Sequence, residues 1–327
     1  MKKILVTGAS GFIGLHCINQ LLQQGYRLKG VVHCKEKANE VNQAMLKHSL
    51  HSINLEIIVL DVLEKKGWEE ALSDCSYVLH IPDPAGEDQL RTTVKGALCI
   101  LNAAKKAKIK KVVMTSSLAA VMGCDGEEKI FSEDDWTDPK DPGIDLYSRN
   151  KTLAELEAWN FVAALPANHS LQLTVIIPSA ICGPILGNDI GTSNAFIAEL
   201  INGRASGLVN LNIGWVDVRD VARAHIEAML SSELDGQRII LCERTLWVSE
   251  IVEHLKVNGF QNLPRFTWPN ILLKFVARLR QQSSVDIKLI GKKRLVSNKK
   301  AGKFFTWKMI GAIDSIAKTA EQLNKNR

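Results

Sequence analysis

A glycine motif close to the start of the chain places the strongest constraint on its fold. The apolar run 4–6 leads directly into glycines at positions 8, 11 and 14, and a helical apolar pattern begins within the motif. This order predicts a buried strand, a tight turn and a helix. Gly8 permits the turn, Gly11 lets the backbone approach a pyrophosphate, and Gly14 lets the helix pack close to the strand. The free N–H groups at the start of that helix favour a bound phosphate.

Strand and helix patterns alternate along the first half of the chain, which predicts an α/β fold with a doubly wound, Rossmann-like parallel sheet. The expected strands are 3–7, 27–32, 55–60, 77–81, 111–116 and 171–178, and the expected helices are 12–24, 35–47, 68–72, 89–106 and 147–165. Beyond Pro178, glycines and prolines mark a loop-rich region. We expect a dinucleotide-binding domain over 1–177, to which 212–243 return, and a smaller C-terminal substrate-binding lobe formed by 178–211 and 244–327.

Composition narrows the class of protein. The 327 residues are 46% hydrophobic, which is enough for one large core with a small appended lobe. No segment resembles a membrane span, and the N-terminal apolar run lies inside the glycine motif without the cleavage site of a signal peptide. The seven cysteines are scattered without a CxxC pair, which favours free thiols in a reducing compartment. We therefore expect a cytoplasmic protein with no metal site.

The net charge of +6 comes largely from one basic stretch, 278–303, in which nine Lys or Arg residues accompany a single acid, Asp286. No nucleic-acid motif and no interleaved aromatic residues accompany these charges, so the stretch does not predict a nucleic-acid partner. We expect a solvated face that attracts an anionic substrate or cofactor.

Tyr147 and Lys151 form the second informative motif. Four residues apart on an expected helix, they lie on one face, and no other tyrosine has a lysine at this spacing. An ammonium beside a phenol stabilises the phenolate and eases proton exchange near neutral pH. A plain surface pair would show the same spacing, so the proton-transfer interpretation depends on the glycine motif and on the hydroxyl residues 115–117 upstream.

Together these motifs resemble those of the extended short-chain dehydrogenase/reductases, in the branch that contains dihydroflavonol, cinnamoyl-CoA and ketone or aldehyde reductases. The resemblance spans most of the chain. It rests on 6–14, Asp61, 112–121, 147–155, 177–178 with 183–184, 216–222 and 319–321. It implies an NAD(P)-dependent oxidoreductase that reduces the carbonyl group of a small molecule to an alcohol.

The resemblance also implies the catalytic roles. Tyr147 would donate the proton to the carbonyl oxygen, Lys151 would stabilise its phenolate and bind the nicotinamide ribose, and Ser117 would hydrogen-bond the same oxygen. Ser116 is the rival for this last role, because adjacent side chains on an extended strand point to opposite sides. The resemblance favours Ser117.

The end of the second expected strand bears on the choice of cofactor. An acidic residue there binds the ribose 2′-hydroxyl of NAD, whereas a basic residue accepts the 2′-phosphate of NADP. His33 holds this position and no carboxylate precedes Glu36, which favours NADP(H) over NAD(H); an exposed loop histidine is the plain alternative. The residues that the motifs and the resemblance assign to the cofactor are Gly8, Ser10, Gly11, Phe12, Ile13, Gly14, His33, Lys37, Asp61, Val62, His80, Tyr147, Lys151 and Pro178.

Two other functions stay open. A nucleotide-sugar epimerase or dehydratase with tightly bound NAD would use the same fold, tyrosine and lysine, whereas a non-catalytic NAD(P)-sensing module would use the fold alone. A sensor needs no proton donor, so Ser117, Tyr147 and Lys151 argue against it. The resemblance further implies a homodimer formed through the helix that begins at Tyr147 and its neighbour.

Overall fold

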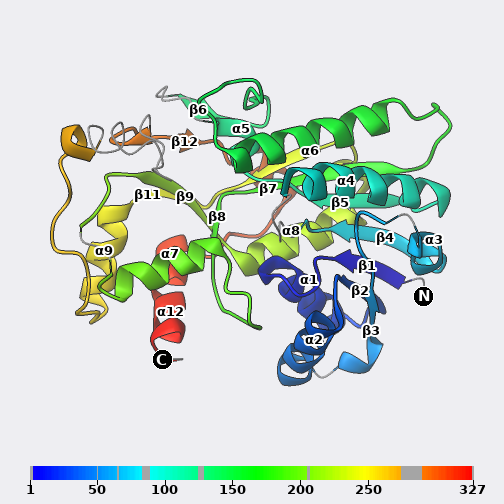
Figure 1. The fold of residues 1–327 in the computed structure, drawn as a ribbon, viewed down its shortest axis with the longest axis horizontal. Helices are drawn as coiled ribbons and strands as arrows, with labels where there is room; N and C mark the ends of the chain where they lie inside the picture. The colour runs from blue at the N-terminus through cyan, green and yellow to red at the C-terminus, as the bar shows by residue number, and fades with distance from the viewer. Residues whose placement is uncertain are drawn as a thin grey trace.

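A seven-stranded parallel sheet forms the centre of the molecule, with strand order β10-β7-β5-β4-β1-β2-β3 (Figure 1). The computed structural model describes residues 3–49, 51–64, 66–82, 89–123, 129–204, 207–273 and 289–325. The strands of this sheet are β1 (Lys3–Thr7), β2 (Leu28–Val32), β3 (Leu55–Val59), β4 (Cys75–His80), β5 (Lys111–Thr115), β7 (Gln172–Pro178) and β10 (Arg238–Leu241). The predicted doubly wound parallel sheet is confirmed.

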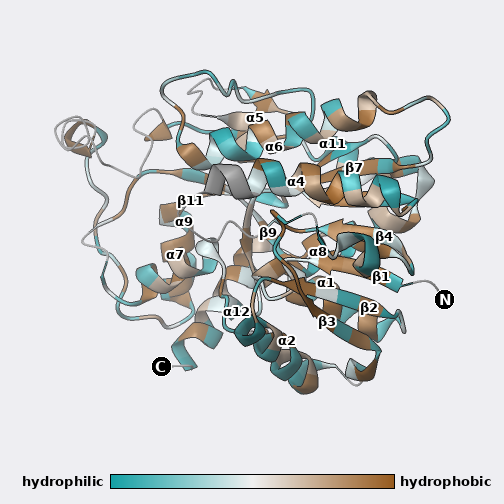
Figure 2. Cartoon of the chain, turned by 45° about the vertical axis from the view of Figure 1, so that its right-hand side comes forward, coloured by the Kyte–Doolittle hydropathy of each residue, from teal (hydrophilic) through white to brown (hydrophobic). Residues whose placement is uncertain are grey.

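Strand β1 shows why the sheet is covered on both faces. Ile4 and Val6 belong to one hydrophobic core, and Leu5, which points to the other face, belongs to a second. A parallel strand buried on both faces reads as a continuous apolar run, as residues 4–6 do. Figure 2 shows hydrophobic residues concentrated on the strands, with hydrophilic residues along the outer side of the helix 35–48.

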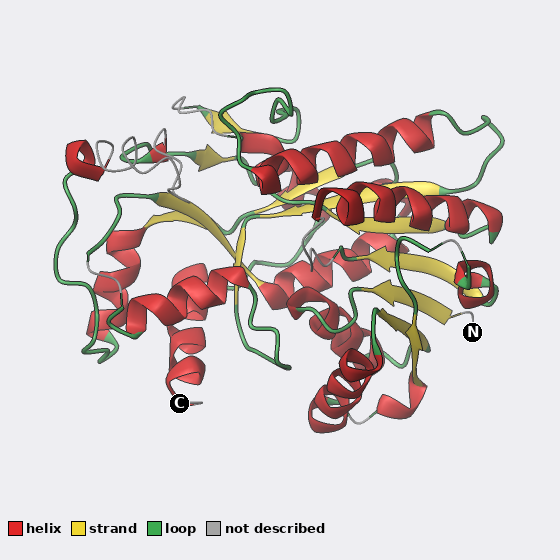
Figure 3. Cartoon of the chain, in the orientation of Figure 1, coloured by secondary structure: helices red, strands yellow, loops and turns green. Residues whose placement is uncertain are grey.

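Two layers of helices enclose the sheet (Figure 3). On one face α1 packs against α2 and α8, and on the other α4 packs against α3 and α6. The helices are α1 (Phe12–Gln23), α2 (Lys35–His48), α3 (Trp68–Leu72), α4 (Gln89–Lys106), α5 (Ala119–Met122), α6 (Leu146–Ala163), α7 (Thr192–Ile201), α8 (Val218–Leu230), α9 (Val248–Val257), α11 (Lys299–Phe304) and α12 (Ala312–Lys325). Within the described ranges, no helix combines the length and the hydropathy needed to cross a bilayer.

Residues that follow β7 build a smaller lobe, which lies on the left in Figure 1. Its sheet consists of β8 (Ala180–Cys182), β9 (Asn212–Asp217) and β11 (Arg244–Trp247). The apolar faces of α7, α9 and α12 cover this sheet around Trp215. Of the segment 212–243, β9 belongs to the small sheet, whereas α8 and β10 pack with the large one.

A two-stranded parallel pair, β6 (Ile130–Phe131) with β12 (Leu295–Val296), brings part of the basic stretch into the fold. Residues 278–288 of that stretch lie outside the described residues. Arg294 departs from the expected solvated face, because it is 9% exposed and its Nη2 donates to the carbonyls of Met122 and Gly123 at 2.6 and 2.9 Å. Buried peptide carbonyls need donors, and this arginine supplies them.

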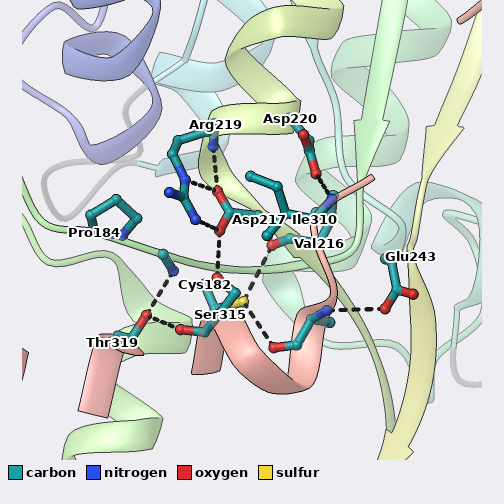
Figure 4. Close-up of polar contacts among 12 residues, drawn as sticks. Cys182, Pro184, Val216, Asp217, Arg219, Asp220, Glu243, Ile310, Ser315 and Thr319 are labelled. Carbon is teal, nitrogen blue, oxygen red and sulfur yellow. Dashed lines mark hydrogen bonds and ion pairs between the residues drawn. The ribbon is translucent and has the colours of Figure 1, made fainter. Parts of the chain in front are cut away.

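The motif 216–222 fastens the C-terminal helix to the rest of the fold (Figure 4). Asp217 is fully buried at the start of α8, where its carboxylate accepts hydrogen bonds from the backbone N–H (2.8 Å), Nε (2.9 Å) and Nη2 (2.7 Å) of Arg219. Ser315 of α12 donates its hydroxyl to the same carboxylate at 2.5 Å. One turn later, Thr319 accepts the N–H of Gly183 at 2.9 Å. Buried polar groups in β9, α8 and α12 therefore satisfy one another.

A second carboxylate of the motif holds the segment that leads into α12. Asp220 accepts the N–H of Ile310 at 2.6 Å (Figure 4). Burial raises the pKa of Asp220 to about 6, and the nearby negative charge of Asp217 acts in the same direction. The proton on Asp220 is therefore held more tightly in the folded chain than in the unfolded one.

Replacing Asp217 by Ala should destabilise the protein. The change leaves the hydroxyl of Ser315 and the guanidinium of Arg219 without their acceptor, so we expect the free energy of unfolding to fall by about 3 kcal/mol. Urea denaturation followed by tryptophan fluorescence measures this change. Glu253→Ala, at an exposed position of α9, is the control and should alter stability by less than about 0.5 kcal/mol. Equal midpoints for wild type and the Asp217 variant would contradict the assignment.

Asp220→Asn should remove a pH dependence of stability. Because the pKa of Asp220 rises from 3.8 to about 6 on folding, the folded chain keeps a proton that the unfolded chain releases. The contribution of Asp220 to stability is thus complete below the lower pKa and is lost as the pH rises through the higher one. Urea denaturation of both proteins over this range should show wild type losing stability relative to the Asn variant. A stability difference that does not change with pH would be the opposite result.

Candidate functional site

The glycine turn at the end of β1 forms one wall of the site. Gly8 adopts a left-handed φ of +60°, and a Cβ there would lie 2.1 Å from the carbonyl oxygen of Ile81. A Cβ on Gly14 would lie 2.1 Å from the carbonyl oxygen of Gly8. Both positions therefore exclude any side chain, and the turn lies directly against β4 and α1.

Helix α1 begins at this turn, and its N-cap residue supplies no side-chain hydrogen bond to the first N–H groups. Gly11 is the N-cap residue and has no side chain to offer, and the first turn contains no acidic residue. The N–H of Phe12 instead donates to Oδ2 of Asp189, at 2.9 Å. The positive end of a helix attracts an anion, and here a carboxylate distant in the sequence accepts one of its N–H groups.

A cavity of about 620 Å³ joins the glycine turn to the Tyr147 helix. Its described lining residues come from the carboxyl ends of β1, β4, β5 and β7, from β8, from the starts of α1, α5, α6 and α7, and from the segment that precedes α7. They are Gly8, Gly11, Phe12, Ile13, Ile81, Pro82, Thr115, Ser116, Ser117, Leu118, Ala119, Tyr147, Lys151, Pro178, Ser179, Ala180, Ile181, Asp189, Gly191, Thr192 and Ser193. Side chains from both lobes thus meet in one pocket, as in many ligand sites of open α/β sheets.

Helix α6 presents Tyr147 and Lys151 to this cavity. Asp145 caps the helix by accepting the N–H of Ser148 at 2.8 Å and its hydroxyl at 2.7 Å. The Tyr147 side chain, in the first turn, is 44% exposed, whereas Lys151 is 6% exposed. Lys151 Nζ lies 5.7 Å from the centre of the Tyr147 ring. An accessible phenol and a buried ammonium therefore lie on the same face of the helix.

The two adjacent serines after β5 have different surroundings. Ser116 is 3% exposed and donates its hydroxyl to Oε2 of Glu155 at 2.5 Å. Ser117 is half-buried, and its Oγ accepts the N–H of Ala119 at 3.2 Å. The hydrogen of the Ser117 hydroxyl can therefore point to a molecule in the cavity, whereas that of Ser116 is engaged by a carboxylate.

Glu155 extends this contact into a buried polar network. It lies one turn beyond Lys151 on α6, has no exposed surface, and accepts Nε of Arg238 at 2.5 Å. Arg238, from β10, also donates to the carbonyls of Glu133 and Asp135. The network connects α6 to β5, to β10 and to the loop that precedes α6.

His80 lies behind the cavity wall at the end of β4. Its Nδ1 is 2.9 Å from Oγ1 of Thr7, which in turn accepts the N–H of Ile81 at 3.1 Å. Burial lowers the pKa of His80 to about 3, and the positive charge of Lys151 acts in the same direction, so the imidazole is neutral. His80 therefore fixes the end of β4, while Ile81 and Pro82 face the cavity.

The residues assigned to the adenosine end of the cofactor lie outside the cavity, after β2 and β3. His33 is exposed, and Lys37 binds Oε2 of Glu40 at 2.8 Å. Asp61 is exposed and accepts the N–H of Leu63 at 2.8 Å, and Val62 is half-buried. Since β2 and β3 follow β1 in the sheet, these residues lie along the same carboxyl edge as the glycine turn.

The remaining assigned residues belong to the turn and to β7. Ser10 is 5% exposed inside the turn, and Pro178 lines the cavity at the end of β7. Sequence reasoning missed Asp189, Thr192 and Ser193, which line the cavity from the smaller lobe. No local pattern marks them, because their approach to α1 depends on how the two lobes pack.

Comparison with known proteins identifies the family. A sequence model of the "NAD dependent epimerase/dehydratase family" matches residues 4–242. Cinnamoyl-CoA reductase CAD2 of Medicago truncatula is 33% identical over 266 residues, which cover 77% of this chain and 79% of the relative. An uncharacterized oxidoreductase of Schizosaccharomyces pombe is 33% identical over 279 residues, which cover 78% and 82%.

The fold is also found among solved structures. The yeast methylglyoxal/isovaleraldehyde reductase Gre2, crystallised in complex with NADPH, aligns over 99% of this chain and 98% of its own, with a TM-score of 0.83 and 24% identity. The family match includes the glycine turn, Tyr147 and Lys151, which carried the resemblance in the sequence. The chain is therefore an oxidoreductase of the NAD dependent epimerase/dehydratase family, an extended short-chain dehydrogenase/reductase, as its motifs predict.

Proposed function

We propose that this protein uses NADP(H) to reduce an aldehyde, a ketone or a dihydroflavonol-like carbonyl compound to the alcohol, with Tyr147 as the proton donor. The observation that carries the proposal is the convergence of Ser117, Tyr147 and Lys151 with the glycine turn on one cavity. The relatives named as reductases support the same direction of chemistry.

The residues of the turn fit a dinucleotide. The backbone at Gly8 and Gly14 leaves no room for side chains, and the start of α1 has no acidic residue of its own. Such a turn brings N–H groups close to a pyrophosphate. When bound, the nicotinamide cofactor supplies the hydride, and the protein positions the carbonyl and handles the proton.

Ser117, Tyr147 and Lys151 each have a separate role in the transfer of the proton. Ser117 donates a hydrogen bond to the carbonyl oxygen, and Tyr147 transfers its phenolic proton to the same oxygen as the carbonyl carbon accepts the hydride. Lys151 stabilises the resulting phenolate, which later regains a proton from solvent. One hydride and one proton would thereby be added across the C=O bond, which gives the alcohol.

The residues that follow β2 support NADP(H) over NAD(H). His33 and Cys34 follow the strand where a carboxylate would bind a 2′-hydroxyl, and the first acidic residue is Glu36. An exposed His33 and the ammonium of Lys37 are the side chains suited to a 2′-phosphate. The related fold of Gre2 was solved with NADPH.

The lining of the cavity favours an uncharged carbonyl compound over a nucleotide sugar. Lys151 is the only Lys or Arg among the described lining residues, and Asp189 is the only acid. The start of α1 suits the pyrophosphate of the cofactor, and the described lining offers a second diphosphate no Lys or Arg besides Lys151. Leu118, Ala119 and Ile181 instead offer apolar contacts.

Tyr147→Phe should lower turnover sharply and leave cofactor binding intact. Removing the proton donor is expected to lower kcat/KM by about 10³-fold, within the usual range for general acid catalysis. The assay is the loss of NADPH or NADH absorbance with aliphatic and aromatic aldehydes, ketones, dihydroflavonols and cinnamoyl thioesters. Tyr26→Phe is the matched control and should retain full activity, because Tyr26 follows the C-terminal end of α1, packs against a hydrophobic core and is not among the described lining residues of the cavity.

Other outcomes of this assay point elsewhere. Turnover that survives in the Tyr147 variant would exclude the proposed proton donor. A wild-type protein that reduces none of these compounds but is purified with NAD bound would favour the epimerase or dehydratase function instead.

Replacing Ser116 and replacing Ser117 should have different effects in the same assay. Ser117→Ala is expected to lower kcat/KM by about 10²-fold, because the carbonyl oxygen loses a hydrogen-bond donor. Ser116→Ala should leave kcat/KM within a few-fold and lower the free energy of unfolding by about 1–2 kcal/mol, because Glu155 loses a donor. A larger kinetic loss for Ser116→Ala than for Ser117→Ala would reverse the assignment.

A further inference from the structure

The carboxylate of Asp189 lies where a cofactor phosphate is expected. Its Oδ2 accepts the N–H of Phe12 at 2.9 Å, and its Oδ1 accepts the N–H of Gly191 at 2.9 Å. A Cβ built on Gly11 would lie 3.6 Å from the same Oδ2. Gly11 is the residue expected to let the backbone approach a pyrophosphate, and in the structure it faces a side-chain anion.

Asp189 belongs to a segment that lies across the outer face of α1. This segment, residues 183–191, is called the strap below. The carbonyl oxygen of Pro184 is 2.8 Å from Nε2 of His16. A Cβ built on Gly187 would lie 2.5 Å from the side chain of Leu15, and one built on Gly191 would lie 2.8 Å from that of Phe12. The strap therefore packs closely on α1 along most of its length.

The anchors of the strap do not depend on Asp189. The side chain of Gln322 in α12 accepts the N–H of Ile185 and donates to its carbonyl, both at 2.8 Å. Thr319 accepts the N–H of Gly183 at 2.9 Å. The N–H of Ala195 in α7 donates to the carbonyl of Gly191 at 3.0 Å, so the other end of the strap is held as well. Release of Asp189 would thus affect the residues between these anchors, among which Asp189 lines the cavity.

We propose that Asp189 is an internal competitor for the pyrophosphate of the cofactor, and that it sets how tightly this protein holds NADP(H). The proposal rests on the proposed function, which supplies a ligand with a pyrophosphate. The N–H of Phe12 cannot serve a carboxylate and a phosphate oxygen equally, and two anions at hydrogen-bond distance from one helix end repel each other. Binding of the cofactor then displaces the carboxylate and shifts the part of the strap that lines the cavity.

Titration of the reduced cofactor's fluorescence tests this proposal without any turnover. Asp189→Asn and Asp189→Ala should lower the Kd of NADPH by about tenfold, the usual effect of one hydrogen bond to a charged group. Adenosine 2′-monophosphate, which competes for the adenosine end and has no pyrophosphate, should bind equally well to all variants. Glu199→Gln, which removes one negative charge at an exposed position of α7, is the matched control and should change neither Kd.

Each other result has a definite meaning. Folded Asp189 variants, with unchanged circular dichroism and Tm, that bind NADPH no more tightly than wild type would overturn the competition. So would an equal gain for adenosine 2′-monophosphate, because that ligand does not reach the start of α1. A wild-type protein that binds neither NADPH nor NADH would overturn both this inference and the proposed function, whereas binding without a difference between variants would overturn only the inference.

Discussion

The buried ion pair of Glu155 and Arg238 is the interaction on which the arrangement of the site depends. Charges removed from water are tolerated only where other polar groups surround them, and here Ser116, Trp159 and two peptide carbonyls do so. The guanidinium also stacks 3.4 Å above the ring of Trp136. Because these partners come from α6, β5, β10 and the loop before α6, the pair fixes those elements relative to one another.

The same ion pair also fixes the site residues of α6 and of the end of β5 relative to one another. Tyr147 and Lys151 precede Glu155 on the same helix, and Ser117 follows Ser116 on the same strand end. Only small displacements of these groups are compatible with the network, since each partner would lose a buried hydrogen bond. The opposite wall of the cavity comes from the strap and the start of α7, whose conformation is set by contacts between lobes. The wall that carries Ser117, Tyr147 and Lys151 is therefore held by buried hydrogen bonds within the larger lobe, whereas the opposite wall is held in part by the contact between Asp189 and the start of α1.

The sequence alone could predict those features that depend on neighbours in the chain. The strand 3–7, the glycine turn and the spacing of Tyr147 and Lys151 are local patterns, and the structure has them at the expected positions. The contact between Phe12 and Asp189 joins residues 177 positions apart and has no local signal. Arg294 is similar, because its basic side chain gives no sign that peptide carbonyls will enclose it. Such pairings follow from the packing of distant segments, which periodicity does not encode.

The late position of β10 in the chain has a consequence for how the protein is made. Strand β7 pairs with β5 on one edge, and its other edge is covered by β10, which is synthesised only after the small lobe's β8, α7 and β9. Until then a nascent chain exposes the apolar, β-prone edge of residues 172–178, and Glu155 has no arginine partner. Exposed edges of this kind pair readily with other strands, so wrong pairing at β7 is possible until residue 241 has left the ribosome.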